Sequence, residues 1–373
     1  MADTVLVTGG AGFVGSHLVD ALLERGDCVR VLDNLLPQAH PTGKARFLSP
    51  EAELVVGDLR DPDTVARCLD GIDVVFHQGG IVGNGQSMYD IRNYADANVV
   101  GTATLIQAML ARRDQFKRLV TASSMVVYGD GAYVCPEHGR VAAVSRPESR
   151  LRQRQWEPVC RTCNAEVAAT ATDEDHALAP TSTYGISKRD QEELTLVLGK
   201  AHGLPAIALR YLNVYGSRQA LSNPYTGVAA IMSARLLNGK PPTIFEDGEQ
   251  RRDLTHVSDI VRANLAAAAA PESACFVPYN VGTGRSVSVK EIARALARAL
   301  GVEIEPDITS EYREGDIRHC YADVTRAREG LGWSARVTFA DGVGELARWA
   351  AGEAPEDRTE AANDELRTLN LIH

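Results

Sequence analysis

The chain has 373 residues, of which 45% are hydrophobic and 24% charged, and its formal net charge is −10. This composition is typical of a folded globular protein, and the length suits one large domain or a main domain with a smaller partner. The acidic balance excludes a nucleic-acid partner held by bulk electrostatics, although a few local cations could still bind an anionic substrate.

The chain also carries no mark of export or membrane insertion. No apolar run is long enough to span a membrane, and the N-terminus has no basic region ahead of an apolar one. Its seven cysteines are odd in number and unevenly spread, unlike a disulfide framework. We therefore expect a cytoplasmic protein with no membrane partner.

Short apolar runs alternate with helical patterns through the first half of the chain. The runs are continuous rather than alternating, which is typical of strands buried on both faces of a parallel sheet. We expect strands at Thr4–Thr8, Cys28–Leu32, Leu54–Val56, Val74–His77, Leu119–Ala122 and Ala206–Leu209. We expect helices at Val14–Arg25, Asp63–Leu69, Val99–Ala111 and Lys188–His202. The pattern predicts an α/β fold with a Rossmann-like doubly wound parallel sheet.

A glycine-rich turn joins the first predicted strand to the first predicted helix. Gly9, Gly12 and Gly15 are spaced three residues apart, which permits a tight turn and close approach of the backbone to a pyrophosphate. Phe13 and Val14 would open the helix, whose N-terminus then faces the phosphates. Alone, the spacing also fits an ordinary glycine-rich turn.

Acidic residues at the next strand ends raise the probability of a dinucleotide site. Asp33 ends the second strand, eighteen residues after Gly15, where a carboxylate can accept hydrogen bonds from a ribose. Asn34 follows, with no arginine to hold a 2′-phosphate, so NAD is favoured over NADP. Asp58 and Leu59 follow the third strand, where Asp58 could meet the adenine or simply serve the turn.

A tyrosine, a lysine and a serine form the candidate catalytic group. Tyr184 and Lys188 are four residues apart and lie on one face if they open a helix. A free tyrosine has a pKa near ~10, and a nearby lysine cation together with a nicotinamide cation would lower it. Ser124 lies at the carboxyl end of the fifth predicted strand, where open α/β sheets bind ligands. The Y-x-x-x-K pattern alone also occurs on exposed helix faces.

With these motifs in order, residues 3 to about 350 resemble the extended short-chain dehydrogenase/reductase family of NAD-dependent nucleotide-sugar epimerases and dehydratases. The segments Arg210–Gly216, Gly248–Asp259 and Tyr312–Asp316 are similar to the R-Y-x-N-V-Y-G, R-D-x-x-H-V-x-D and R-x-G-D segments of that family. The resemblance implies a nucleotide-diphosphate sugar substrate contacted by Asn213, Phe245, Arg252, Arg313 and Asp316. It also implies cofactor contacts from Gln78 and Asn98, and a homodimer.

One departure from the family narrows the expected reaction. Met125 and Val126 follow Ser124, where sugar 4,6-dehydratases of the family carry an Asp-Glu pair and nucleotide-glucuronate decarboxylases a glutamate. A 4-epimerase needs only the serine, tyrosine and lysine with bound NAD. We therefore expect a nucleotide-sugar 4-epimerase on a dTDP- or UDP-hexose. The alternatives are an NAD-dependent keto-sugar reductase or dehydrogenase, and a non-catalytic dinucleotide sensor.

A surplus segment separates the serine from the tyrosine. It holds Cys135, His138, Cys160 and Cys163, whose C-x₂-H and C-x₂-C spacing predicts a structural zinc site in a zinc-ribbon-like insertion. An incidental cluster of free thiols is the alternative. The Cys-Pro-Glu-His-Gly stretch is similar to that of a dTDP-L-rhamnose 4-epimerase-like subgroup, and the chain as a whole also resembles UDP-glucose 4-epimerase-like members. The arginines of the insertion could cap the substrate, join a subunit interface or form a solvated basic face.

These observations together predict the domain layout. We expect an NAD-binding Rossmann domain at 1–210, with 245–270 returning to it. A smaller α/β substrate-binding domain would take 211–244 and 271–350. The zinc-ribbon-like insertion would take 131–175, and 353–373 would form a charged tail.

Overall fold

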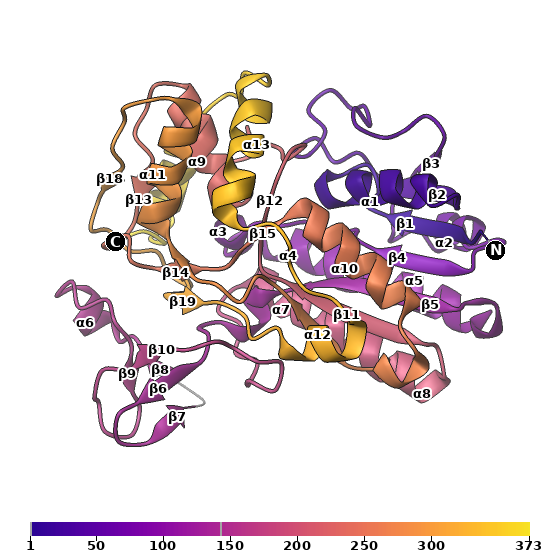
Figure 1. Ribbon diagram of the computed structural model, residues 1–373, viewed down its shortest axis with the longest axis horizontal. Coiled ribbons are helices and arrows are strands. Elements are labelled where there is room, and N and C mark those ends of the chain that lie inside the picture. Colours follow the sequence, from indigo (N-terminus) through magenta and orange to yellow (C-terminus); the bar gives the residue numbers. More distant parts are fainter. Residues whose placement is uncertain (1, 142–143) are drawn as a thin grey trace.

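The computed structural model describes residues 2–141 and 144–373 (Figure 1). Met1 and residues 142–143, which fall in the predicted 1–210 and 131–175 segments, lie outside the described residues. Within the described part a parallel seven-stranded sheet runs in the order β16-β11-β5-β4-β1-β2-β3. Its strands are β1 Thr4–Thr8, β2 Cys28–Asp33, β3 Glu53–Val56, β4 Val74–His77, β5 Arg118–Ser124, β11 Ala206–Tyr211 and β16 Pro278–Val281.

The sheet is covered on both faces, which explains its continuous apolar strands. In β1, Val5 and Val7 pack into the core beneath α1 (Phe13–Glu24) and α10 (Val257–Ala269). Leu6, between them, points to the opposite core beneath α2 (Pro62–Cys68), α5 (Gly101–Leu110) and η4 (Leu194–Leu198). The doubly wound prediction is confirmed. Strand order reverses between β1 and β4, so a crevice opens at their carboxyl ends.

Two helical segments begin earlier than the sequence indicates. The predicted helix at Val99 continues from η1 (Ala95–Val100), a π-helical stretch that joins α5 directly. The helix predicted from Lys188 begins at Thr183 as α7 (Thr183–Glu193), capped by Ser182, and runs through η4 into α8 (Gly199–His202). Tyr184 and Lys188 therefore share one helix, as expected.

The second lobe has its own core, built from α9 (Val228–Leu237), α11 (Val289–Leu300) and α13 (Phe339–Ala351). Small sheets connect it to the main domain: β12 (Asn213–Tyr215) with β15 (Leu254–His256), β13 (Thr243–Ile244) with β18 (Asp307–Ile308), and β14 (Arg251–Arg252) between β17 (Val287–Ser288) and β19 (His319–Cys320). Figure 1 shows α9 and α11 at the upper left with α13 beside them, away from β2 and the edge strand β3.

One stretch of the expected substrate domain belongs to the sheet instead. β16 lies within 271–350, yet it pairs with β11 from Ala208↔Pro278 to Tyr211↔Val281. The helix α12 (Thr325–Leu331) then packs on β16. The four-residue strand is too short to be recognised from its sequence, and its place follows only from pairing with β11.

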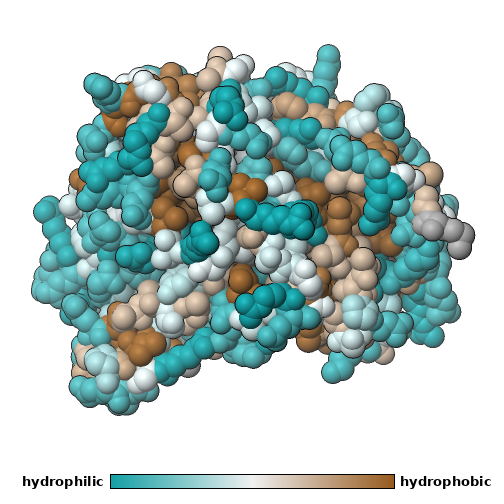
Figure 2. Space-filling model, in the orientation of Figure 1, coloured by the Kyte–Doolittle hydropathy of each residue, from teal (hydrophilic) through white to brown (hydrophobic). Residues whose placement is uncertain are grey.

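The insertion is made of short antiparallel ribbons (lower left in Figure 1). One joins β10 (Ala168–Ala169), β6 (Tyr133–Cys135) and β7 (Gly139–Val141), and another joins β8 (Val144–Ser145) and β9 (Val159–Cys160), with α6 (Glu148–Leu151) between. Its small core is built from Tyr133, Cys135, Cys160 and Val167. The surface seen from this side is mostly hydrophilic, with an apolar patch over the insertion (Figure 2).

The predicted charged tail is a packed element. Residues Thr359–Thr368 form α14, whose Leu366 is buried with Phe245 and Ile372. A β-bridge joins Arg313 to Ile372. The expected charged tail at 353–373 thus includes a packed helix, because Leu366, Leu371 and Ile372 give this charged segment an apolar side. Within residues 2–141 and 144–373, each helix is too short or too polar to cross a bilayer.

Candidate active site

A cavity of about 980 Å³ occupies the crevice between the sheet and the second lobe. It gathers nearly every residue that the sequence assigned to cofactor or substrate. The predicted residues that line it are Gly9, Gly12, Phe13, Val14, Gly15, Asp33, Asn34, Asp58, Leu59, Gln78, Ser124, Tyr184, Lys188, Asn213, Phe245, Arg252, Arg313 and Asp316.

Asn98 is the exception. It is fully buried and does not line the cavity. Its amide accepts from the Ile81 N–H (2.8 Å) and donates to the Ile81 carbonyl (3.1 Å) and the Ser187 hydroxyl (2.9 Å). A Cβ on Gly80 would lie 2.8 Å from its Oδ1. Asn98 therefore supports the turn beside the cofactor end rather than facing the cavity.

The glycine loop leaves room that larger residues would fill. Gly9 has φ +68°, and a Cβ on Gly15 would come within 2.2 Å of the Gly9 carbonyl oxygen. Gly12 precedes α1, so the free N–H groups of that helix face the cavity. This cradle fits a dinucleotide diphosphate, as the glycine spacing predicts.

The two acids of the cofactor end differ in their surroundings. Asp33 accepts the Ala11 N–H at 3.0 Å and the Leu35 N–H at 2.9 Å, so one carboxylate braces the glycine loop and its own turn. A hydrogen-bonded ion pair with Arg60, which outweighs partial burial, lowers the pKa of Asp58 to about 2. Asn34 contacts Asp58 at 3.5 Å. Both acids therefore present fixed acceptors at the rim.

The candidate acid–base pair is enclosed by protein. Burial raises the pKa of Tyr184 to about 12, partly offset by a hydrogen bond with Ser124. Burial lowers the pKa of Lys188 to about 8, while its ammonium donates to the Ala122 carbonyl at 2.9 Å and to Gln191 Oε1 at 2.8 Å. Desolvation dominates the pKa of Tyr184 in the protein by itself. The expected lowering by Lys188 together with a nicotinamide cation stays a prediction.

A chain of buried side chains leads away from Lys188. Gln191 donates its Nε2–H to His77 Nε2 at 2.9 Å, and His77 Nδ1 lies 2.7 Å from the Thr8 hydroxyl. Burial lowers the pKa of His77 to about 3, so the ring is neutral and can accept this hydrogen bond. His77 is thus a support for Gln191 and Lys188, a role that its place at the end of β4 did not reveal.

Two arginines occupy the far end of the cavity. Arg252 donates to the carbonyls of Ile317 (2.6 Å) and Arg318 (3.0 Å), and no carboxylate among the described residues lies within 4.0 Å of it. Arg313 pairs with Asp316 at 2.8 Å and lies over the Phe245 ring, 4.6 Å from its centroid. Of these two arginines, Arg252 is therefore the one whose charge is not neutralised by a carboxylate in the described residues, so it can pair with an anionic ligand.

Asn213 offers a second polar group in the same region. Its buried Oδ1 has no hydrogen-bond partner among the described residues, although it borders the cavity. A buried acceptor without a partner is costly, so its place suggests a donor supplied by a ligand. Sugar hydroxyls are donors of this kind.

The wall beyond Ser124 is apolar, as the sequence indicates. Met125 and Val126 open η3 (Met125–Tyr128) and both line the cavity. Neither can transfer a proton. The cavity wall beside the acid–base pair is therefore apolar at the two positions where dehydratases of the family were expected to carry acids.

Comparison with known proteins assigns the chain to a family. The profile of the NAD dependent epimerase/dehydratase family matches residues 5–149 and 162–282. The chain belongs to this family. A dTDP-L-rhamnose 4-epimerase from Burkholderia thailandensis is 32% identical over 353 residues, covering 94% of this chain and 95% of that protein.

Solved structures of family members agree in fold. The UDP-glucose 4-epimerase of Thermotoga maritima with UDP-glucose has a TM-score of 0.75 at 29% identity, covering 93% of this chain and 98% of that one. The Thermus thermophilus UDP-glucose 4-epimerase complex with NAD has a TM-score of 0.74 at 30% identity, covering 94% and 99%. These relatives are nucleotide-sugar epimerases, which are isomerases, and they share the overall fold of this chain.

Sequence reasoning missed several polar residues of this epimerase-family cavity. Asn223 and Tyr225 follow no recognised motif, yet they line it together with Gln38. Gln38 donates to Asn223 Oδ1 at 3.0 Å. Glu365 of α14 accepts from the hydroxyl of Tyr225 at 3.0 Å. Only the spatial meeting of distant segments reveals these contacts, because each stretch reads locally as a loop or charged helix.

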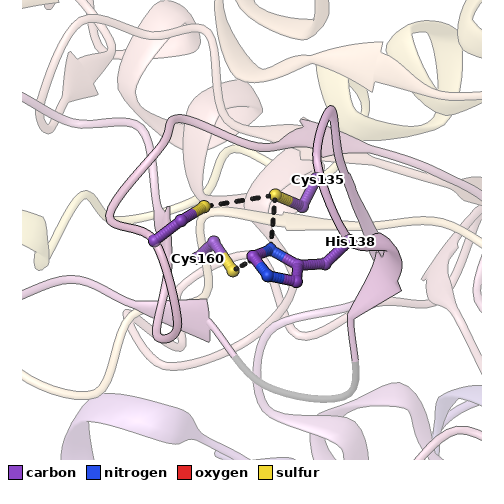
Figure 3. Close-up of side chains that lie close together, drawn as sticks. Cys135, His138 and Cys160 are labelled. Carbon is purple, nitrogen blue, oxygen red and sulfur yellow. Dashed lines mark hydrogen bonds between the residues drawn. The ribbon is translucent and has the colours of Figure 1, made fainter.

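The two matched stretches of the family profile are interrupted at 150–161, which lies within the 131–175 insertion. Cys135, His138 and Cys160 converge with Cys163 (Figure 3). Their ligand atoms lie within 4.8 Å of one another, with Cys135 Sγ 3.5 Å from His138 Nδ1 and 3.6 Å from Cys163 Sγ. The four predicted residues thus meet in one cluster, although their atoms belong to separate ribbons.

Hydrogen bonding favours the ligand form of one thiol. Backbone N–H groups of Cys163 and Thr162 lower the pKa of Cys160 to about 6. The thiolate is the form of cysteine that binds metals. His138 directs its Nδ1 toward Cys135 Sγ at 3.5 Å and Cys160 Sγ at 3.7 Å.

Proposed function

We propose that the chain is an NAD-dependent nucleotide-sugar 4-epimerase acting on a dTDP- or UDP-hexose. The observation that carries the proposal is the placement of Tyr184 and Ser124 on one cavity with Arg252, while Met125 and Val126 supply no acid. The 4-epimerases among its relatives support this reaction over dehydration.

Bound NAD would supply the hydride acceptor and donor for the sugar C4 carbon. Tyr184 takes the proton of the C4 hydroxyl, and Ser124 holds the same oxygen by a hydrogen bond. The 4-keto sugar then turns over in the cavity and its other face is reduced, while Tyr184 returns the proton. The hydrogen bond with Ser124 opposes the rise in the tyrosine pKa caused by burial. We expect Lys188 together with the nicotinamide cation to lower that pKa further.

The cofactor would be held by the glycine loop and its neighbours. Gly9, Gly12, Phe13, Val14 and Gly15 offer the diphosphate cradle, and the remaining contacts would come from Asp33, Asn34, Asp58, Leu59 and Gln78. The catalytic Tyr184 and Lys188 complete that set. Tight retention is expected because no net oxidation occurs.

The substrate would lie across the second lobe. Arg252 and Arg313 would bind the diphosphate, with Asp316 orienting Arg313 through their ion pair. Phe245 would face the base and Asn213 a hydroxyl. These residues span both sides of the cavity, so substrate binding depends on how the two lobes meet.

The rival is an NAD-dependent reductase or dehydrogenase of nucleotide-linked keto-sugars. An epimerase regenerates its cofactor in each cycle, whereas the rival consumes it. We would denature the purified protein, measure the released nucleotide, and follow dTDP- and UDP-hexoses by NMR without added cofactor. About one NAD per chain with 4-epimers formed supports the proposal, and turnover only with added NADH or NAD would establish the rival.

We further propose that Cys135, His138, Cys160 and Cys163 bind a structural zinc ion. Tetrahedral zinc with Zn–S near about 2.3 Å and Zn–N near about 2.1 Å places ligand atoms about 3.5–3.8 Å apart. The distances of 3.5, 3.6 and 3.7 Å between ligand atoms fit that geometry. Four protein ligands leave no open position, so the role is structural. Elemental analysis should find one zinc per chain, lost in Cys160→Ser.

We also propose a homodimer formed by the α4–η1–α5 and α7–η4 helices, with α4 at Ile91–Tyr94. Ile91, Val100, Ile186 and Val197 are apolar and exposed there, Val197 by 62%. We expect these apolar side chains to form one face that favours association. Val197→Glu should shift light-scattering mass to a monomer, whereas Ile308→Glu, an exposed apolar site on the second lobe, should leave it unchanged. A wild-type monomer would refute this proposal.

A further inference from the structure

The insertion contacts the loops that hold the substrate candidates through charged side chains. These side chains are Arg146 and Glu157. They are carried by the ribbon in which β8 pairs with β9, Val144 facing Cys160 and Ser145 facing Val159. One strand of this ribbon therefore ends at a cysteine of the metal cluster, and Glu157 lies three residues before it.

Arg146 reaches the loop that carries Phe245. Its guanidinium forms an ion pair with Glu246, and both side chains are largely buried, 10% and 2% exposed. Glu246 has φ +57°, a backbone conformation that residues other than glycine adopt only when their surroundings hold it. The same guanidinium donates to the Asp316 carbonyl at 3.2 Å. Arg146 thus contacts the neighbour of Phe245 and the backbone of Asp316, which are two of the substrate candidates.

Glu157 reaches the loop that holds Arg252. It accepts from Arg318 at 2.5 Å and from His319 at 2.9 Å. Hydrogen bonds from His319 and Arg318 outweigh the effect of burial and lower the pKa of Glu157 to about 2, so it is ionised at neutral pH. Arg318 is fully buried, and its backbone carbonyl accepts from Arg252. Glu157 therefore fixes the segment whose carbonyls aim the Arg252 guanidinium at the cavity.

Arg318 joins the two contacts into one network. It pairs with Glu246 at 2.9 Å and with Asp247 at 2.7 Å, in addition to Glu157. A buried arginine held by several carboxylates has one defined position, because losing one partner leaves charge uncompensated. The loops at 245–247 and 316–319 are thus locked to each other and to the insertion.

We propose that the insertion is a positioning element for the nucleoside-diphosphate end of the substrate site, in which Arg146 and Glu157 hold the 245–247 and 316–319 loops. The metal cluster orders the ribbon that carries both residues, so metal occupancy sets affinity for the nucleoside diphosphate. The acid–base pair at the other end of the cavity is outside this network. The proposal rests on the proposed nucleotide-sugar function and zinc site.

The test measures binding of UDP and dTDP by calorimetry in the full-length, NAD-loaded protein and its variants. Arg146→Gln and Glu157→Gln should each raise Kd about tenfold, the loss expected when one partner of a buried hydrogen-bonded pair is removed. The kcat at saturating nucleotide sugar and the NAD content should stay within twofold. Arg140→Gln is the matched control, since Arg140 lies in the insertion but pairs with the nearby Asp173. It should bind like the wild type.

A second arm leaves the sequence unchanged. Zinc is removed with a chelator and then restored, while NAD content and the thermal transition report the state of the main domain. Kd should rise on removal and recover on restoration. An unchanged Kd in both variants and after zinc removal would overturn the inference, as would a fall in kcat with Kd constant. If the wild type binds neither nucleotide and turns over no sugar, the proposed function fails as well.

Discussion

The two ends of the cavity are built in different ways. The cofactor end uses the first strands and turns of the sheet in chain order, so Gly9, Asp33 and Gln78 face the cavity because parallel strands end at one edge. The substrate end combines segments separated by tens of residues, 213–225, 245–252 and 313–316. Its positions depend on a network of buried charges around Arg318.

The difference between the two ends indicates which substitutions should have independent effects. At the cofactor end Asp33 accepts the backbone N–H groups of Ala11 and Leu35. At the substrate end a change is transmitted through shared partners, because Glu246 pairs with both Arg146 and Arg318. We therefore expect catalytic-end variants to affect kcat separately, and substrate-end variants to affect binding jointly.

The largest effect should come from Tyr184→Phe. The ring is retained and only the proton carrier is lost, so kcat should fall about 10³-fold while Kd for UDP or dTDP changes little. Steady-state kinetics with calorimetry would measure both. Arg140→Gln, whose side chain pairs with Asp173 away from the cavity lining, is the activity control. Unchanged turnover in Tyr184→Phe would refute the assignment of the acid–base residue.

The second effect concerns stability and its dependence on pH. Lys188 has a pKa of about 8 in the folded chain against 10.5 in water, so the folded state binds fewer protons between these values. Stability of the wild type should then rise with pH through this window, by at most about 3 kcal/mol for a pKa difference of about 2.5. Below pH 8 the full cost of the buried charge is present.

Lys188→Met removes that charge and should remove the pH dependence with it. Urea unfolding of both proteins at pH 7, 8 and 9.5 would compare the slopes, with other titrating groups cancelling in the difference. The range stops below pH 10 because Tyr184, whose pKa is raised to about 12, contributes the opposite trend above it. Parallel stability profiles would contradict the lowered pKa of Lys188.

The features that could be predicted from the sequence lie mainly at the cofactor and catalytic end of the cavity. The glycine loop, Ser124 and the pair of Tyr184 and Lys188 are local patterns, and a parallel sheet brings strand ends together whatever the loops do. Asn98 stays a predicted cofactor contact, since matching a motif does not say whether an amide faces the cavity or its own turn. β16 and α14 were not recognised, because their places depend on contacts with Tyr211 and Phe245 far away in the chain.

Side-chain networks were the least accessible to sequence reasoning. The insertion was expected from its cysteines, but nothing in its arginines separates Arg146, which is buried against Glu246, from Arg152, which is exposed and pairs with Glu148. Two residues with the same chemistry differ only in what the fold places opposite them. The choice between a capping, interface or solvated role therefore required coordinates.

A smaller effect should separate the two diphosphate arginines. Arg252→Gln removes the cation without a carboxylate partner in the described residues, and we expect Kd for UDP or dTDP to rise about 30-fold, consistent with loss of a charged hydrogen bond. Arg313→Gln should cost less, because its charge is already shared with Asp316. Equal losses in the two variants would mean that the ion pair opens when nucleotide binds.

The smallest effect tests whether the catalytic end is truly independent of its neighbours. Gln191→Leu removes the acceptor of Lys188 and the donor to His77, so the ammonium keeps only the Ala122 carbonyl, and kcat should fall about tenfold with Kd unchanged. Gln191→Glu is the informative partner variant, because a carboxylate raises the lysine pKa and should extend activity to higher pH. Gln86→Leu is the matched control, since this amide meets Gln38 away from Lys188. If Gln191 had only a structural role, both variants would lose stability and the pH profile of activity would not move. A shifted pH profile in Gln191→Glu would therefore identify Gln191 as a positioning residue for Lys188.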